Sequence, residues 1–222
     1  MNTIILLLSS VVYASAYICC PPTKWEGQFG ELGGYVTDKT KESGVFTVAA
    51  TAHIDSDIQK VAMETARQVK IIQDYKKKIM YTIAGGNCTK TALQGTVEDD
   101  VCIPDRAKYF TTLTYFGEDL IADDYIYDIV LHGMKLTTIS LVTRSSCIPM
   151  GLQGKVEAKD VKAIYSGGFF NVTLGIEDPS VFDVPAICQH AIAAKESGDS
   201  LVGSQFMEAL TSDLDFKQRK SN

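Results

Sequence analysis

The sequence FTVAATAHI occupies residues 46–54 and alternates between an apolar series and a second series rich in threonine. A period of two with one apolar face is typical of a half-buried β-strand. The stretch therefore predicts a strand on which one series of side chains faces the interior together. The members of this inner series are Phe46, Val48, Ala50, Ala52 and Ile54.

Most of the remaining chain also has the composition of β-strands. Four further segments are rich in Thr, Val, Ile and aromatic residues, namely 78–84, 109–116, 135–143 and 169–176. Glycines at 33–34, 85–86, 117 and 167–168 predict breaks between strands. Only residues 187–196 and 204–214 favour helix. No repeat or linker interrupts the pattern, so we predict one mostly β domain over residues 17–222, with short helices near the C-terminus.

The strand around Asn171 gives an orientation. Asn171-Val172-Thr173 is an N-glycosylation sequon, and a glycan must point to water. If Asn171 faces outward, alternation directs every second neighbour inward. These inward residues would be Phe170, Val172, Leu174 and Ile176. Such a row fits either a filled core or the wall of an apolar cavity, and the periodicity alone does not separate the two.

The first sixteen residues have the features of a secretory signal peptide. A short apolar core is followed by Ala14-Ser15-Ala16, a small-residue cleavage signature, so residues 1–16 are expected to be removed. No later stretch is apolar enough to span a membrane. The formal charge of −6 argues against nucleic acid and anionic membranes as partners. We therefore expect a secreted protein without a transmembrane segment.

All six cysteines follow the predicted cleavage point, which favours three disulfides in an exported chain. Their spacing matches no zinc site. Cys19 and Cys20 are adjacent, so each is expected to reach a different distant partner. A second sequon, Asn87-Cys88-Thr89, agrees with export, which makes Asn87 and Asn171 the candidate glycosylation sites.

The sequence carries no pattern that indicates catalysis. The histidines His53, His132 and His190 are isolated, and no nucleophile elbow, zinc-protease motif or phosphate loop is present. We therefore predict that the protein is not an enzyme.

Acidic residues cluster between 118 and 128, and oxygen-rich loops can hold calcium. We predict weak calcium binding by Asp119, Asp123 and Asp124. A solvated acidic loop is the alternative interpretation of this cluster.

Four motifs in order resemble those of the ependymin family. They are Cys20-Pro21-Pro22-Thr23-Lys24-Trp25-Glu26-Gly27, Ile103-Pro104-Asp105, Cys147-Ile148-Pro149, and the segment 174–182, LGIEDPSVF, followed by Pro185 and Cys188. The resemblance implies two antiparallel sheets curved into a half-barrel around an apolar pocket, similar to bacterial lipoprotein carriers. It also implies disulfides Cys20–Cys147 and Cys88–Cys188, which leaves Cys19–Cys102 as the third. Which of Cys19 and Cys20 pairs with Cys102 is left open.

The family is secreted, glycosylated and often dimeric, is associated with calcium and cell–matrix adhesion, and has lipid-binding members. Two functions follow from this resemblance. The first is an extracellular carrier that holds a lipid or fatty acid, with calcium as a second ligand. The alternative is an adhesive protein of the extracellular matrix, including mineralised matrix, that carries no ligand. A homodimer is expected in either case.

Overall fold

The structure is a computed structural model that describes residues 17–66, 68–115, 119–131, 134–158, 160–189 and 191. The predicted signal peptide and the helix predicted over 204–214 lie outside these residues. Among the described residues, no helix is long and apolar enough to cross a bilayer.

The fold is mostly β, as predicted, and consists of two antiparallel sheets of very unequal size. The large sheet has eleven strands in the order β7-β6-β5-β4-β3-β2-β13-β12-β11-β10-β9 and does not close on itself. Its strands are β2 (Lys24–Thr37), β3 (Ser43–Asp55), β4 (Lys60–Thr65), β5 (Lys70–Asp74), β6 (Ile79–Ala84), β7 (Asn87–Ala92), β9 (Lys108–Tyr115), β10 (Leu120–Leu131), β11 (Met134–Thr143), β12 (Pro149–Glu157) and β13 (Val161–Leu174). The small sheet pairs β1 (Tyr17–Cys19) with β8 (Ile103–Pro104).

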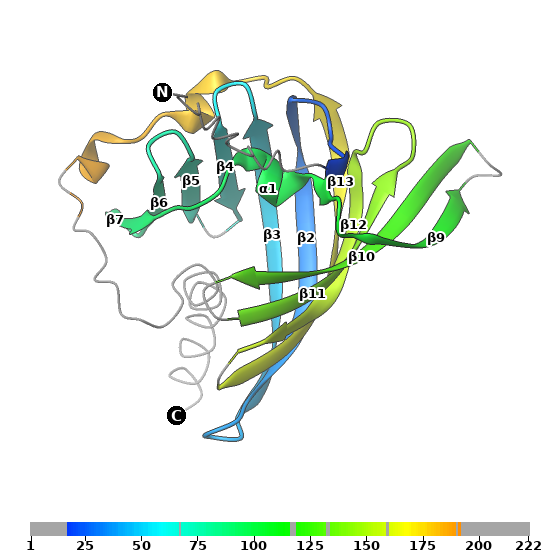
Figure 1. The fold of residues 1–222 in the computed structure, drawn as a ribbon. Helices are drawn as coiled ribbons and strands as arrows, with labels where there is room; N and C mark the ends of the chain where they lie inside the picture. The colour runs from blue at the N-terminus through cyan, green and yellow to red at the C-terminus, as the bar shows by residue number, and fades with distance from the viewer. Residues whose placement is uncertain are drawn as a thin grey trace, which may run out of the picture.

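Two meanders meet at the centre of the large sheet. Strands β2 to β7 pair in chain order on one side, and β9 to β13 pair in chain order on the other. The long strands β2 and β13 join the meanders, from Val161 opposite Thr37 to Leu174 opposite Trp25. The sheet curves strongly, so that β10 and β11 turn across the front of β2 and β3 (Figure 1). This half-barrel has a concave and a convex face.

The strand predicted over 46–54 lies inside β3, and its inner series faces the concave side. Trp25 is paired with Ile54, and Phe29 with Ala50, so alternate residues of β2 share that face. The glycines at 33–34 and 167–168, predicted as breaks, lie within β2 and β13. The Phe46 ring covers Gly33, where even a Cβ would come within 2.2 Å of the ring, and this contact explains a glycine inside a strand.

A short helix, α1 (Val97–Val101), covers one end of the concave face. Thr96 caps it by accepting a hydrogen bond from the Asp99 amide, while the Asp99 carboxylate accepts one from the Thr96 amide. Val97 is fully buried in a cluster with Trp25, Ala52, Ile54, Val61, Tyr75, Met80 and Leu93. The Tyr75 hydroxyl also donates to the Asp100 carboxylate, which ties β5 and its following turn to the helix.

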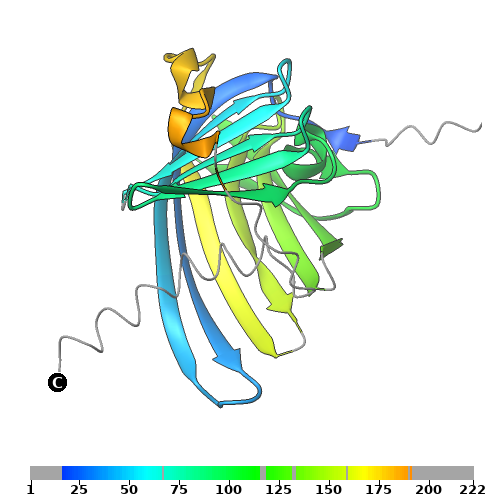
Figure 2. The ribbon, with the colours of Figure 1, turned by 90° about the vertical axis from the view of Figure 1, so that its left-hand side faces the viewer.

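The convex face of β4–β7 is covered by the segment that follows β13 (Figure 2). This segment contains two 3₁₀ helices, η2 (Pro179–Phe182) and η3 (Ala186–Cys188). Cys188 packs with Ile72 and Tyr81, and its disulfide to Cys88 anchors the segment to β7. The first two residues of the helix predicted over 187–196, Ile187 and Cys188, form the end of η3.

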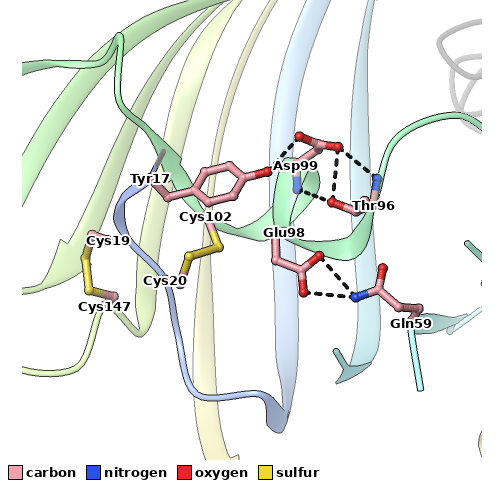
Figure 3. The surroundings of a disulfide bond; sticks show 9 residues. All are labelled: Tyr17, Cys19, Cys20, Gln59, Thr96, Glu98, Asp99, Cys102 and Cys147. Carbon is pink, nitrogen blue, oxygen red and sulfur yellow. Dashed lines mark hydrogen bonds between the residues drawn. A yellow bond between two sulfur atoms is a disulfide. The ribbon is translucent and has the colours of Figure 1, made fainter. Parts of the chain in front are cut away.

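The N-terminal disulfides differ from the pairing that the family resemblance implied (Figure 3). Cys19 is joined to Cys147, and Cys20 is joined to Cys102. The pairs Cys20–Cys147 and Cys19–Cys102 were therefore wrong. Neighbouring residues of an extended chain point to opposite sides, so the pairing depends on which side of β1 faces the end of α1. The orientation of β1 is reinforced by the Tyr17 hydroxyl, which donates a hydrogen bond to the Asp99 carboxylate of α1 at 2.8 Å.

Candidate functional site

The candidate site is the middle of the concave face, where β2, β3 and β13 lie side by side. Phe46, Val48 and Ala50 on β3 are all buried here, as is Phe29 on β2. Phe46, Val48 and Ala50 belong to none of the packed hydrophobic clusters of the described residues, whereas Phe29 contacts Phe169, which packs against the cluster around Trp25. The predicted inward orientation of Phe46, Val48 and Ala50 agrees with this placement.

The row predicted on β13 is only partly inward, because a bulge interrupts the strand. Asn171 has a φ of +52°, a conformation that Asn tolerates better than most residues, and the register shifts between Phe170 and Thr173. Before the bulge, Phe169 faces inward and contacts the Trp25 ring at a centroid distance of 5.5 Å. Phe170 therefore points to the convex side and is 50% exposed.

Beyond the bulge, Val172 packs against the core cluster that contains Trp25. Leu174, at the end of the strand, is 67% exposed, and Ile176 lies beyond β13. The predicted inward position of Phe170 was therefore wrong, whereas Leu174 is on the side of Trp25 by register but lines no buried surface. An inserted residue shifts the alternation by one, which a strict period of two does not allow for.

Two aromatic rings lie over glycines of the neighbouring strand on the concave face. Phe46 covers Gly33, and the Tyr165 ring covers Gly154, where a Cβ would meet the Tyr165 oxygen at 2.7 Å. Each ring therefore occupies the space that a side chain at the glycine would need.

Hydroxyl groups line the concave face of the second meander. Thr138 and Tyr165 share a hydrogen bond of 2.9 Å between β11 and β13. Ser140 and Tyr127 share another of 2.9 Å between β11 and β10. Burial raises the pKa of both tyrosines. We call these four residues the hydroxyl row; we had not identified them from the sequence, although Thr138 and Ser140 alternate within the strand predicted over 135–143.

Glu31 on β2 lies between the hydroxyl row and the apolar residues of β3. It is opposite Val48 on one side and Gly167 on the other. Burial raises the pKa of its carboxyl from the usual 4.5 to about 7. A carboxyl whose pKa is raised into the neutral range is the kind of group that often marks a binding site.

A hollow of about 360 Å³ lies on the other side of the sheet, beside Phe170. Most of its lining side chains belong to the convex face by register, and the lining comprises Gln28, Phe29, Ala49, Ala50, Thr51, Glu64, Thr65, Ala66 and Phe170. The Asn171 side-chain amide donates to Gln28 at 3.2 Å, so this sequon stands at the rim of the hollow. Asn171 and Asn87 are both exposed, which leaves both available as glycosylation sites.

The acidic residues predicted to bind calcium do not converge in the described part of the chain. Asp123 accepts hydrogen bonds from Arg144 at 2.6 Å and 2.9 Å and from Thr112 at 2.6 Å. The Arg144 guanidinium lowers the pKa of the Asp123 carboxyl, whereas burial raises that of Asp124. Asp123 and Asp124 are consecutive in β10 and point to opposite faces, and Asp119 is exposed in the turn before it.

Among the described residues, no group of three or more His, Cys, Asp and Glu side chains could hold a metal ion. His53 pairs with Glu26 at 3.0 Å on the convex face. His132 and His190 lie outside the described residues.

Comparison with known proteins gives the family. The sequence profile of the ependymin family matches residues 63–188, more than half of the chain. The chain belongs to the ependymin family. Ependymin-related protein 1 of Haliotis asinina is 28% identical over 200 residues, which cover 82% of this chain and 96% of that protein. Mammalian ependymin-related protein 1 of Mus musculus is 28% identical over 145 residues, which cover 64% of this chain and 62% of that protein.

Two solved structures of bacterial proteins have a loose likeness to this ependymin-family chain. A LolA superfamily protein of Nitrosomonas europaea aligns with a TM-score of 0.33 and 7% identity, over 75% of this chain and 93% of its own. A putative outer membrane lipoprotein-sorting protein domain of Vibrio parahaemolyticus aligns with a TM-score of 0.31 and 7% identity, over 70% of this chain and 89% of its own.

Proposed function

We propose that this chain is an extracellular carrier that holds an apolar ligand, such as a lipid or fatty acid, against the concave face of its large sheet. The proposal rests mainly on one observation. Phe29, Phe46, Val48 and Ala50 form a buried apolar row at the middle of that face, and the last three lie outside the packed clusters of the described residues.

The unequal sizes of the two sheets support the same interpretation. In a β-sandwich, a second sheet of similar size packs about 10 Å away and fills the core. Here the second sheet has two short strands, and α1 covers only the end of the concave face that carries Trp25. An acyl chain that lies along the apolar row would gain roughly 0.8 kcal/mol per buried methylene.

Secretion, glycosylation and binding without catalysis belong to the same proposal. The three disulfides fit folding in an oxidising compartment. The exposed sequons at Asn87 and Asn171 fit passage through the secretory pathway. Calcium binding, matrix adhesion and a homodimer stay predictions, and the adhesive function remains the alternative to the carrier.

A pair of variants tests the carrier. Ala50→Trp places an indole on the concave face, whereas Ala49→Trp places the same group one residue away on the convex face. We expect Ala50→Trp to weaken the binding of a fluorescent fatty acid at least tenfold, measured by titration, because the indole occupies the space of the acyl chain. Ala49→Trp should bind like the wild type.

The opposite pattern, with binding lost only in Ala49→Trp, would place the ligand in the convex hollow instead. Absence of fatty-acid binding by the wild type, together with a strongly destabilised Ala50→Trp, would indicate a filled core and favour the adhesive function. Urea unfolding of both variants separates these outcomes from simple misfolding.

A further inference from the structure

Glu31 differs from the other carboxylates of the central strands in having no partner. In the described part of the chain it makes no hydrogen bond and no ion pair. By contrast, Glu26 on the opposite face of β2 pairs with His53 at 3.0 Å, and Glu64 on β4 pairs with Lys70 at 2.7 Å. Asp123, at the end of the concave face, is held by Arg144. Glu31 is thus a partly buried carboxyl without compensation.

The surroundings of Glu31 offer it little stabilisation. Its inward neighbours are Val48 on β3, Gly167 on β13, and Phe29 and Gly33 along its own strand. Gly167 carries no side chain, and a Cβ there would approach the Glu31 Cβ to 3.1 Å, so the carboxyl is not covered from that side. Burying a carboxyl in apolar surroundings is costly, and a well-packed apolar residue would avoid this cost.

Tyr165 of the hydroxyl row lies diagonally opposite Glu31 on the same face, because it is paired with Gly33, two residues along β2. Burial raises the pKa of Tyr165, and the negative charge of Glu31 raises it further. A carboxylate beside a tyrosine ring is a pair that favours a cation, because the ring face attracts positive charge as well. No Lys or Arg of the described residues supplies that cation.

We propose that Glu31 receives the cationic amine head of an amphiphilic ligand whose hydrocarbon chain lies along Phe46, Val48 and Ala50. This inference rests on the proposed carrier function and specifies its ligand class. The amine donates hydrogen bonds to the Glu31 carboxylate, and binding supplies the partner that the folded chain lacks. The hydrocarbon chain of the ligand covers the apolar row. The amine head and the hydrocarbon chain would then both find their partners on the concave face.

The test compares three fluorescent probes of one chain length: an amine, an alcohol and a carboxylate, each used below its micellar concentration. The proteins are the wild type, Glu31→Gln, and the control Glu157→Gln, which removes an exposed convex-face carboxylate that pairs with Lys155. For the wild type we expect the amine to bind roughly ten- to hundredfold tighter than the alcohol, as a charge-assisted hydrogen bond allows. Glu31→Gln should lose this preference, while Glu157→Gln keeps it.

Each outcome decides the proposal. Equal preference for the amine in wild type and Glu31→Gln, with all three probes bound, would overturn the role of Glu31 and leave the carrier function intact. Tighter binding of the carboxylate than of the amine by the wild type would overturn it as well. Absence of binding for all three probes would refute the carrier function together with the inference. Matching circular dichroism spectra of the three proteins would establish that Glu31→Gln is folded.

Discussion

The two halves of the concave face are built on different principles. On the side of β4–β6, apolar residues from four strands pack against α1 around Trp25, which is 1% exposed. On the side of β10–β13, the hydroxyl row pairs Thr138 with Tyr165 and Ser140 with Tyr127 within the sheet itself. The first half needs a covering element to bury its residues. The second half satisfies its polar groups within the sheet, and Tyr127 also packs against the smaller apolar cluster of Ile103, Ala107 and Val142.

This difference separates stability from binding. The cluster around Trp25 removes apolar surface from water and should carry much of the folding free energy. The hydroxyl row contributes less, because each hydrogen bond replaces bonds to water. Thr138 and Ser140 are buried, so the part of this half that is left for the proposed ligand is its edge at Glu31. The boundary between the halves lies at β2, which contributes Trp25 to one half and Glu31 to the edge of the other.

The largest expected effect is at Trp25. Trp25→Ala should lower the free energy of unfolding by about 3–5 kcal/mol, because it leaves a cavity between α1, β3 and Phe169. Phe170→Ala, which removes an aromatic ring that is half exposed on the convex face, should cost less than about 1 kcal/mol. Urea unfolding measures both. Similar losses in the two variants would contradict the assignment of the core to the apolar half.

A smaller effect is expected from pH at the boundary between the halves. The folded state keeps the Glu31 proton up to about pH 7, whereas the unfolded chain releases it near 4.5. The free energy of unfolding should therefore be highest below pH 4.5, fall as pH rises from 4.5 to about 7, and stay reduced above pH 7. We expect a loss of about 1–2 kcal/mol, after allowance for the partial exposure of the carboxyl.

The measurement is the difference between wild type and Glu31→Gln across pH 4 to 8, an interval of about four units around that window. Subtraction matters because burial also raises the pKa of Asp100, to about 6. Tyr165, the titratable side chain diagonally opposite Glu31, has a raised pKa that lies above this pH range. A difference that is flat with pH would show that Glu31 is solvated in the folded state.

The smallest effects are expected in the hydroxyl row. Tyr165→Phe should cost roughly 1 kcal/mol, since it removes one neutral hydrogen bond and leaves Thr138 unpaired. Combined with Thr138→Val in a double-mutant cycle, the two changes should not add, because they share one bond. Full additivity would show that each hydroxyl bonds elsewhere, and would weaken the contrast between the halves.

The apolar half could be anticipated from the sequence better than the polar half. The alternation over 46–54 correctly placed Phe46, Val48 and Ala50 on one inner face, because side chains of a regular strand have a period of two. The same argument gave the wrong side for Phe170, since it assumed a strand without a bulge at Asn171. A positive φ is a backbone property that the residue type permits but does not require.

Glu31 and Tyr165 were not predicted as site residues from the sequence, for a different reason. Gly33 and Gly34 indicated a break two residues after Glu31, so this carboxylate was not assigned to a strand interior. Only the pairing of β2 with β3 brings the Phe46 ring over Gly33 and shows that the strand continues. The pairing of Tyr165 with Thr138 likewise depends on the register of β11, β12 and β13. The composition of a strand does not identify which residue of the next strand lies opposite it, and a shift by one residue reverses the face of every side chain.

The pairing of β2 with β13 also bears on the order in which the protein forms. Each meander is built from neighbours in sequence and can begin to pair while the chain is being synthesised. The junction between them joins Trp25 to Leu174, contacts of high sequence separation that form slowly because a long loop must close first. Glu31 and Phe29 lie on one side of this junction, and Tyr165 and Phe169 lie on the other. The ligand site should therefore be among the last parts to form, so a chain that can bind has already completed its fold.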